Sequence, residues 1–306
     1  MSYFGFYNIN KPPGPTSHDI VAQVRSSLGR KVKVGHAGTL DPFASGVLVV
    51  AVGPATRLTH YVQASRKCYT AEVTLGACST TDDIAGDITP TSAVAQPTGE
   101  QIRRTLARFV GEIMQEPPAY SAVHIDGERA YGLARRGKSV RAPARAVRVY
   151  RLDLLGYEYP RVELDVQCGA GVYIRSLARD IGASLGVGGY CSRLIRRAVG
   201  PFTIDRAVEV EMFDAEGDLI PPVSAVARMA VFEVPASLTA PLVQGKTLDV
   251  AALRHVARPA DAVELDEPAG GTGEVALVDV AGGLLAIGEL RAHGRKVHPQ
   301  KVFVQP

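Results

Sequence analysis

The sequence has few cysteines and no long apolar run, and each shortage excludes a class of protein. The 306-residue chain contains four cysteines, none at the C-x-x-C spacing of zinc or redox sites. A disulfide framework is unexpected in a chain of this length. We therefore expect four buried, reduced thiols, at Cys68, Cys78, Cys168 and Cys191. The apolar run of residues 47–52 is far too short to cross a bilayer, which takes about 20 residues.

The chain also lacks a secretory signal pattern and a strong net charge. Residues 1–10 read MSYFGFYNIN, without a basic start and a long apolar stretch, so we expect a cytoplasmic protein. The net charge is +3, with 46% hydrophobic and 21% charged residues, which is ordinary for a globular protein. The position of the positive charge is therefore more informative than its sum.

One stretch has no acidic residue at all. Residues 129–152 contain two tyrosines and eight basic residues, which are Arg129, Arg135, Arg136, Lys138, Arg141, Arg145, Arg148 and Arg151. A solvated face usually mixes charges of both signs. A run of one sign with aromatic residues suits a phosphate backbone and a stacked base. A second, smaller cluster consists of Arg193, Arg196 and Arg197, and we expect both clusters to contact phosphates.

Periodic apolar residues predict three helices in the first 200 residues. Thr16 and Asp19 have the spacing of a capping box, so a helix is expected from about residue 17 until Gly29 stops it. A second capping box, at Thr98 and Gln101, predicts a helix whose apolar face includes Ile102, Leu106, Phe109 and Ile113. The third helix has apolar residues at Ile174, Ala178, Ile181 and Leu185.

Runs of buried or alternating residues predict strands between and after these helices. We expect strands at residues 47–52, 68–75 and 162–168, and a hairpin at residues 275–280 and 284–290. The pattern lacks the regular alternation of a doubly wound sheet, so the fold class is α+β. We expect a large domain at residues 1–230 and a small, mainly β domain at residues 231–306.

The loop of residues 35–42, GHAGTLDP, fixes a carboxylate between two ordered elements. Its glycines permit tight turns and close approach to a ligand, and Pro42 restricts Asp41 to an extended backbone. Reactive groups are often presented on such loops. An Asp before Pro in a glycine-rich loop is more often a turn former, however, so this loop alone does not establish a site.

Several motifs in the right order resemble the bacterial tRNA pseudouridine-55 synthase family. The motifs are NKPPGPTSHD, GHAGTLDPFASGVL, KCY at residues 67–69, PAYSA at 118–122, GVYIRSLARD at 171–180 and LIRR at 194–197. The resemblance covers most of residues 5–205. It implies a mixed, largely antiparallel sheet of the pseudouridine synthase type, with a small C-terminal β domain that binds RNA.

The family's reaction is an isomerisation of uridine 55 in the T-loop of tRNA. The base is cut from ribose at N1, turns within the site and is reattached through C5. No cofactor or metal is needed, and the sequence offers no convincing site for one. The resemblance implies that Asp41 is the catalytic carboxylate, either as a nucleophile or as a base that removes a sugar proton. The sequence leaves both routes open.

The resemblance assigns further roles around Asp41. Arg175 is expected to pair with Asp41, lowering its pKa and fixing its orientation. Tyr69 is expected to stack on the flipped uracil and to serve in proton transfer at C5, although by itself it could be an ordinary strand tyrosine. His36 would fill the space that the extruded base leaves. The remaining expected site residues are Asp83, Tyr173 and Leu194.

The resemblance implies a monomer that acts on the T-stem-loop of tRNA without a protein partner or a membrane. A segment of about residues 124–151 would close over the RNA. His124 departs from the family pattern, which usually has lysine there, and this puts one phosphate contact in doubt at neutral pH. Two alternatives remain open: a non-catalytic RNA-binding or RNA-folding protein of the same fold, and a guide-RNA-dependent enzyme.

Overall fold

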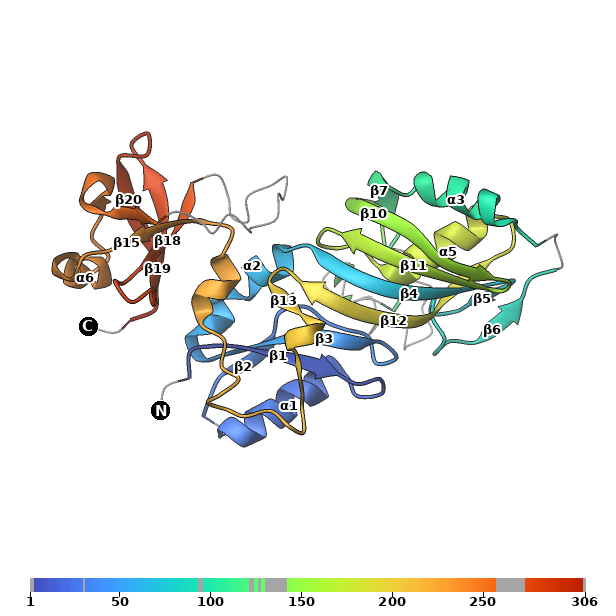
Figure 1. The fold of residues 1–306 in the computed structure, drawn as a ribbon, viewed down its shortest axis with the longest axis horizontal. Helices are drawn as coiled ribbons and strands as arrows, with labels where there is room; N and C mark the ends of the chain where they lie inside the picture. The colour runs from blue at the N-terminus through green and yellow to red at the C-terminus, as the bar shows by residue number, and fades with distance from the viewer. Residues whose placement is uncertain are drawn as a thin grey trace.

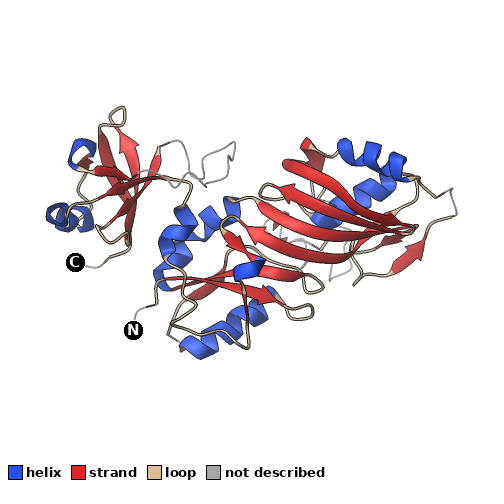
Figure 2. Cartoon of the chain, viewed as in Figure 1, coloured by secondary structure: helices blue, strands red, loops and turns tan. Residues whose placement is uncertain are grey.

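The computed structural model describes residues 3–29, 31–92, 96–120, 142–256 and 273–304, and the backbone of residues 124–125 and 128–129. Two sheets account for most of this structure (Figure 1). Helices flank the strands of both sheets, as Figure 2 shows. Within the described residues, no helix is long and apolar enough to span a membrane.

The larger sheet has ten strands, in the order β14-β1-β3-β12-β4-β11-β10-β7, with β13 beside β12 and β2 beside β3. The strands are β1 (Gly5–Lys11), β2 (Val34–His36), β3 (Ser45–Val52), β4 (Lys67–Leu75), β7 (Gly111–Gln115), β10 (Arg145–Glu158), β11 (Arg161–Cys168), β12 (Gly189–Val199), β13 (Phe202–Thr203) and β14 (Val208–Glu209). The pairs β1–β14 and β3–β12 are parallel, and the other described pairs in this sheet are antiparallel. The expected α+β class with a largely antiparallel sheet is confirmed.

The smaller sheet begins at Ala230 and has the order β16-β20-β19-β18-β15-β17. Its strands are β15 (Ala230–Glu233), β16 (Leu248–Asp249), β17 (Arg254–Val256), β18 (Glu274–Val278), β19 (Leu284–Arg291) and β20 (Lys296–Val302). The expected hairpin is confirmed as β18 and β19. Two short hairpins complete the described strands: β5 (Ala77–Ser79) with β6 (Ile88–Pro90), and β8 (His124–Ile125) with β9 (Glu128–Arg129).

The helices are α1 (Ser17–Leu28), α2 (Thr59–Ala64), α3 (Gly99–Ala107), α5 (Ile174–Ser184) and α6 (Ala236–Val243), with 3₁₀ turns at Gly53–Leu58, Ile204–Arg206, Pro222–Val226 and Val250–Ala252. Both expected capping boxes are present, with Thr16 and Thr98 as the N-caps. The expected extent of α3 is wrong, because Phe109 lies in a turn and Ile113 in β7. The helix ends in two hydrogen bonds of the 3₁₀ type, which Arg108 N donates to Thr105 O and Phe109 N donates to Leu106 O.

Strict alternation gives β4 two different faces. Tyr69, Ala71 and Val73 belong to a buried apolar cluster with Leu177 and Ile181 of α5, and we call this side of β4, β11 and β12 the inner face. The residues between them point to the opposite, outer face. The inner face therefore brings strand residues and the start of α5 together.

A second apolar cluster joins the two sheets. Phe6 and Val49 of the large sheet share it with Ala276 and Ile287 of the small one. Polar contacts reinforce this junction, since the Tyr61 hydroxyl donates to Glu274 at 2.9 Å. The small sheet is therefore packed against the region of α2.

The cysteines only partly follow the expectation of four buried thiols. All four are free, and Cys168 and Cys191 are buried. Cys78 is exposed and Cys68 is half-buried, so the expectation is wrong for these two. Cys78 lies in the short two-stranded hairpin β5–β6, outside the two large sheets.

Candidate active site

Asp41 lies on the loop between β2 and β3, and the polar backbone groups of this loop are tied to several elements. The Ser17 hydroxyl of α1 donates to Leu40 O and accepts from Leu40 N, both at 2.9 Å. The Lys11 ammonium of β1 donates to Pro42 O at 3.2 Å. Gly14 N donates to the same carbonyl at 2.8 Å. The backbone around the carboxylate is thus fixed before any substrate arrives.

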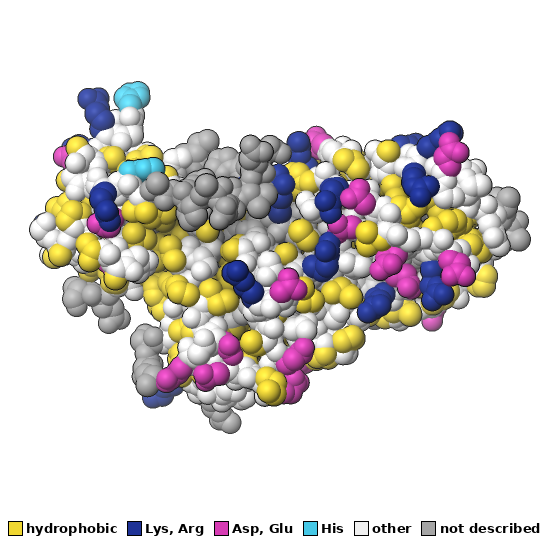
Figure 3. All heavy atoms as spheres, in the orientation of Figure 1, with side chains coloured by type: hydrophobic (Ala, Val, Ile, Leu, Met, Phe, Trp, Pro, Cys, Tyr) yellow, Lys and Arg dark blue, Asp and Glu magenta, His cyan; other side chains and the backbone are white. Residues whose placement is uncertain are grey.

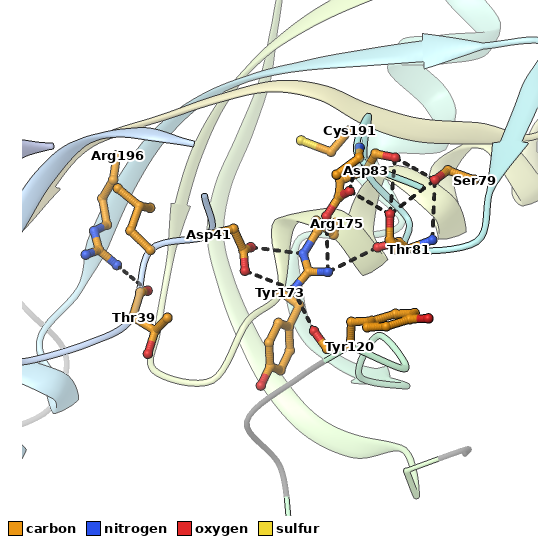
Figure 4. A network of polar contacts seen from close by, with 12 residues as sticks. Thr39, Asp41, Ser79, Thr81, Asp83, Tyr120, Tyr173, Arg175, Cys191 and Arg196 are labelled. Atoms are coloured by element: carbon orange, nitrogen blue, oxygen red, sulfur yellow. Dashed lines mark hydrogen bonds and ion pairs between the residues drawn. The ribbon is translucent and has the colours of Figure 1, made fainter. Parts of the chain in front are cut away.

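Arg175, in the first turn of α5, binds the Asp41 carboxylate with two nitrogens. Its Nε lies 2.9 Å from Asp41 Oδ2, and its Nη2 donates to Oδ1 at 3.1 Å. Figure 4 shows the two side chains facing each other. The side chain of Asp41 is 30% exposed and that of Arg175 only 5%, so the carboxylate can be reached while its partner cannot. The hydrogen bond from Nη2 and the close ion-pair contact at Nε together fix the orientation of the carboxylate.

Other groups hold the Arg175 guanidinium in turn. Its nitrogens donate to Thr81 O at 3.1 Å and to Tyr120 O at 3.0 Å. Asp83 Oδ2 lies 3.2 Å from Nη1. Asp83 is itself buried, and its other oxygen accepts from the Thr81 hydroxyl at 2.6 Å and from Ala85 N at 2.9 Å. One guanidinium therefore joins two carboxylates and two loop carbonyls (Figure 4).

The pKa of Asp41 reflects opposing effects. Burial raises the pKa of the Asp41 carboxyl above its ordinary value, the Arg175 guanidinium opposes this rise, and the Asp83 carboxylate adds to it. The expectation that Arg175 lowers this pKa is right for its own effect, but burial is the larger effect. Arginine remains charged in proteins, so Asp41 still has a permanent cation at hydrogen-bonding distance.

Tyr69 and Leu194 approach the same site from the inner face of the sheet. Tyr69 on β4 is 8% exposed and pairs across the sheet with Arg196 on β12. Burial raises the pKa of the Tyr69 hydroxyl to about 12, and Arg196 opposes the rise. The phenol is thus protonated at neutral pH. Leu194 is buried two residues before Arg196 and pairs with Ala71.

His36 ends β2 and precedes the catalytic loop. Its ring meets the ring of His18 edge-on, with the centroids 5.2 Å apart. The pKa of His36 is lowered to about 4, mainly by burial and also by the nearby His18 and Arg196, so the ring is neutral at physiological pH. Its buried Nδ1 has no hydrogen-bond partner within the described part of the chain.

Tyr173 is the N-cap residue of α5 and lies next to Arg175. Gln115 of β7 holds its backbone, since Tyr173 N donates to Gln115 Oε1 at 2.8 Å and Gln115 Nε2 donates to Tyr173 O at 3.1 Å. The Arg145 guanidinium lies 5.4 Å from the centroid of the Tyr173 ring and donates to Gly171 O at 2.9 Å. Arg145 is therefore beside the site.

The expected phosphate contacts have different outcomes. Arg135, Arg136, Lys138 and Arg141 lie outside the described residues, and only the backbone is described at His124 and Arg129. Arg193 is exposed but lies on the outer face. On the side of the molecule in Figure 3, basic side chains are interspersed with acidic ones.

The expected phosphate contact of Arg196 is wrong, because its side chain is buried. Its residue is 3% exposed, and its guanidinium donates to Val47 O at 2.8 Å, to Thr39 O at 3.1 Å and to Gly38 O at 3.1 Å. Arg196 turns inward, whereas Arg193, which pairs with Glu72, and Arg197, which contacts Asp165, turn outward. A charge count in the sequence cannot separate these neighbours.

Four groups at the site were not predicted from the sequence: Lys11, Ser17, Gln115 and the Thr81 carbonyl. Lys11 and Ser17 lie in the motif NKPPGPTSHD, and the match of this motif to the family was the one sequence signal that pointed to them. Gln115 carried none. Within the described residues, no group of three His, Cys, Asp or Glu side chains could hold a metal ion.

Comparison with solved structures extends the similarity beyond the sequence motifs. The chain is similar to a protein in a structure of an H/ACA RNP bound to a substrate RNA containing 2'-deoxyuridine, with a TM-score of 0.73 and 27% identity over 98% of this chain and 85% of that one. It is also similar to a chain in a Cbf5-Nop10-Gar1 complex, with a TM-score of 0.72 and 29% identity over 99% and 85%.

Sequence comparison gives the family. Residues 25–174 match the model of the TruB family pseudouridylate synthase N-terminal domain. The tRNA pseudouridine synthase B of Microcystis aeruginosa (strain NIES-843 / IAM M-2473) is 46% identical over 74% of this chain and 78% of its own length. That of Arthrobacter sp. (strain FB24) is 42% identical over 71% and 72%. By fold and sequence the chain is an isomerase of the pseudouridylate synthase class. Within this class it belongs to the TruB family.

Proposed function

We propose that the protein converts uridine 55 in the T-loop of tRNA to pseudouridine, with Asp41 as the catalytic carboxylate. The observation that carries this proposal is the pair between Asp41 and the buried Arg175, which leaves the carboxylate partly exposed. The names of the relatives, tRNA pseudouridine synthase B, support the choice of tRNA as the substrate.

The reaction rearranges bonds within one nucleoside. The C1′–N1 bond breaks, the uracil turns, and a C1′–C5 bond forms. C5 then loses its proton and N1 gains one, so the product is an isomer and no oxidant is required. Asp41 assists the first bond cleavage by one of two routes. It attacks C1′ and is displaced when the C1′–C5 bond forms, or it removes a sugar proton to give a glycal and returns this proton when C5 adds to C1′.

Tyr69 and His36 contact the RNA when the uridine is extruded from it. The Tyr69 ring stacks on the extruded uracil, and its hydroxyl takes part in the proton transfer at C5. The His36 ring occupies the space left by the base, which offsets part of the lost stacking. The ring is neutral, and its unpartnered Nδ1 can form a hydrogen bond with a base or a ribose group.

The basic residues at positions 129–145 contact the phosphates of the T-stem-loop. Each neutralised phosphate contributes about 0.7–0.9 to the dependence of log affinity on log salt. Replacing Arg135, Arg136 and Arg141 by Gln together should therefore reduce this slope by about 2 units. An unchanged slope in filter-binding titrations would refute the contacts.

The deciding experiment combines the purified protein with an unmodified tRNA transcript, followed by carbodiimide mapping of pseudouridine. We expect one modification, at position 55, and none in a transcript that has cytidine there. Modification by the isolated protein would exclude a requirement for guide RNA or partner proteins. Tight tRNA binding without any pseudouridine would instead indicate the non-catalytic alternative.

A further inference from the structure

Arg196 is a buried cation that donates three hydrogen bonds to backbone carbonyls and also interacts with the Tyr69 hydroxyl. Its three hydrogen bonds join β12 to Gly38 and Thr39 of the catalytic loop and to Val47 at the start of β3. Within the described residues its guanidinium forms no ion pair with a carboxylate. A buried charge costs free energy unless hydrogen bonds compensate it, so the three carbonyls are needed to stabilise the Arg196 guanidinium.

The carbonyls that Arg196 holds lie just before the catalytic residue. Gly38 and Thr39 come three and two positions before Asp41, whereas Ser17 holds Leu40 and Lys11 holds Pro42. Every backbone carbonyl from residue 38 to 42 thus accepts a hydrogen bond, that of Asp41 coming from Ala44 N at 3.1 Å. Arg196 is the member of this set that comes from the central strands of the sheet.

The strand that carries Arg196 is itself held close to the loop. Arg196 pairs with Gly46 of β3, where φ is +101°. A Cβ at Gly46 would lie 2.3 Å from the Arg196 carbonyl oxygen, so only glycine permits this approach. The start of β3 and the guanidinium therefore have a fixed separation.

The charge of Arg196 also lies beside the reacting groups. In the view of Figure 4, Asp41 lies between Arg196 and Arg175. Arg196 acts electrostatically on both Asp41 and Tyr69, in each case favouring the ionised form. Asp41 thus has one cation, Arg175, in direct contact and a second cation, Arg196, bonded to the backbone of its loop.

We propose that Arg196 is a positioning residue, which fixes the Gly38–Thr39 backbone so that the Asp41 carboxylate points at the nucleoside and which stabilises its negative charge. This inference rests on the proposed role of Asp41. A planar fork with several donors is needed to reach three carbonyls at once, so lysine cannot replace it fully.

The test compares Arg196→Lys and Arg196→Met in single-turnover isomerisation of tRNA at saturating enzyme, with Kd measured separately. A displacement of about 1 Å can lower a rate about 100-fold, so we expect a loss of that order in Arg196→Met and at least about 10-fold in Arg196→Lys. The Kd for tRNA should stay within about threefold of the wild-type value, because the Arg196 side chain is buried and does not contact the RNA. A wild-type rate in Arg196→Lys, or a loss confined to Kd, would overturn the proposal.

The pH dependence of the single-turnover rate provides a second readout. Asp41 must be ionised, and removing a neighbouring cation raises its pKa, so the acid limb should move to higher pH in Arg196→Met but not in Arg196→Lys. The other groups that act on Asp41 are unchanged in both variants; they are Arg175 of α5, Asp83 of the loop between β5 and β6, Lys11 of β1, Tyr69 of β4 and Cys191 of β12. An acid limb at the wild-type pH in Arg196→Met would overturn the electrostatic part.

Arg25→Met is a matched control, because Arg25 also donates to a carbonyl, Val34 O at 3.1 Å, but lies on an exposed part of α1. Its rate should equal that of the wild type. Thermal melting checks folding, and Arg196→Lys keeps a buried cation if Arg196→Met does not fold. A wild-type protein that forms no pseudouridine would refute the proposed function; an active wild type with an unaffected Arg196→Lys would refute the present inference alone.

Discussion

The inner and outer faces of the central strands use the same residue types for different purposes. On the inner face, Arg196 is bonded to loop carbonyls and Tyr69 is buried beside it. On the outer face, the next arginine, Arg197, is 42% exposed and pairs with Asp165, which also binds Arg151. The difference teaches that adjacent arginines in a strand can belong to separate functional systems, because one residue of rise reverses the direction of the side chain.

Among changes at the active site, Asp41→Asn should have the largest effect on turnover. This change keeps the shape of the side chain but removes the charge, so turnover should fall by about 10⁴-fold or more. Binding of tRNA should change less than about threefold, because the loop remains tied at its backbone. Asp153→Asn, which alters a half-exposed carboxylate paired with Arg151, is the control and should be fully active. Substantial turnover by Asp41→Asn in the mapping assay would contradict the role.

Arg175→Met should have the next largest effect. It removes the two-pronged partner of Asp41, and a loss of about 10²–10³-fold in the single-turnover rate is expected. The ionised carboxylate is the active form and is lost as pH falls through its pKa. Burial has already raised this pKa, and removing Arg175 raises it further, so the acid limb should move to higher pH.

Arg179→Met is the control for this shift. Arg179 lies one helical turn after Arg175 and pairs with Asp82 at 2.8 Å and Asp180 at 2.9 Å. Its acid limb should coincide with that of the wild type. Equal shifts in both variants would show that the effect comes from damage to α5 and not from the loss of the Asp41 partner.

Tyr69→Phe tests the polar function of a buried inner-face residue. The ring remains for stacking, but the hydroxyl is lost, so the rate should fall by about 10²-fold. The free energy of unfolding should change by about 1 kcal/mol or less, as measured by urea titration. Tyr190→Phe is a matched control, because Tyr190 on β12 is also 8% exposed. Similar rate losses in both variants would remove the special role of Tyr69.

Arg197→Met should have the smallest effect and sharpens the contrast with Arg196. Asp165 keeps its contact with Arg151, and a half-exposed ion pair contributes about 0–1 kcal/mol to stability. Turnover should stay within about twofold of the wild type. A defect as large as that of Arg196→Met would mean that the outer face also serves the reaction.

The local elements of the site could be predicted because their signals are local. The capping box at Thr16 and Asp19 fixes the start of α1 in a few residues of sequence, and the apolar run before Gly53 specifies β3. The extent of α3 could not be predicted, since Ile113 fits a helical period equally well but pairs with Val147 of β10. Sheet pairing overrides periodicity when the partner is distant in sequence.

Consecutive residues were enough to indicate the family, the α+β class and the loop that contains Asp41, because ordered motifs and short-range propensities are local in the sequence. The contact of Arg175 with this carboxylate, 134 positions away, was expected from the family resemblance and is present, whereas only the folded chain shows that Arg196 holds the loop while Arg197 faces away. The physical reason is that these roles depend on which face of a strand is buried and on which carbonyls remain unpaired near it. Both are settled when distant strands come together, and a count of charges along the chain does not contain them.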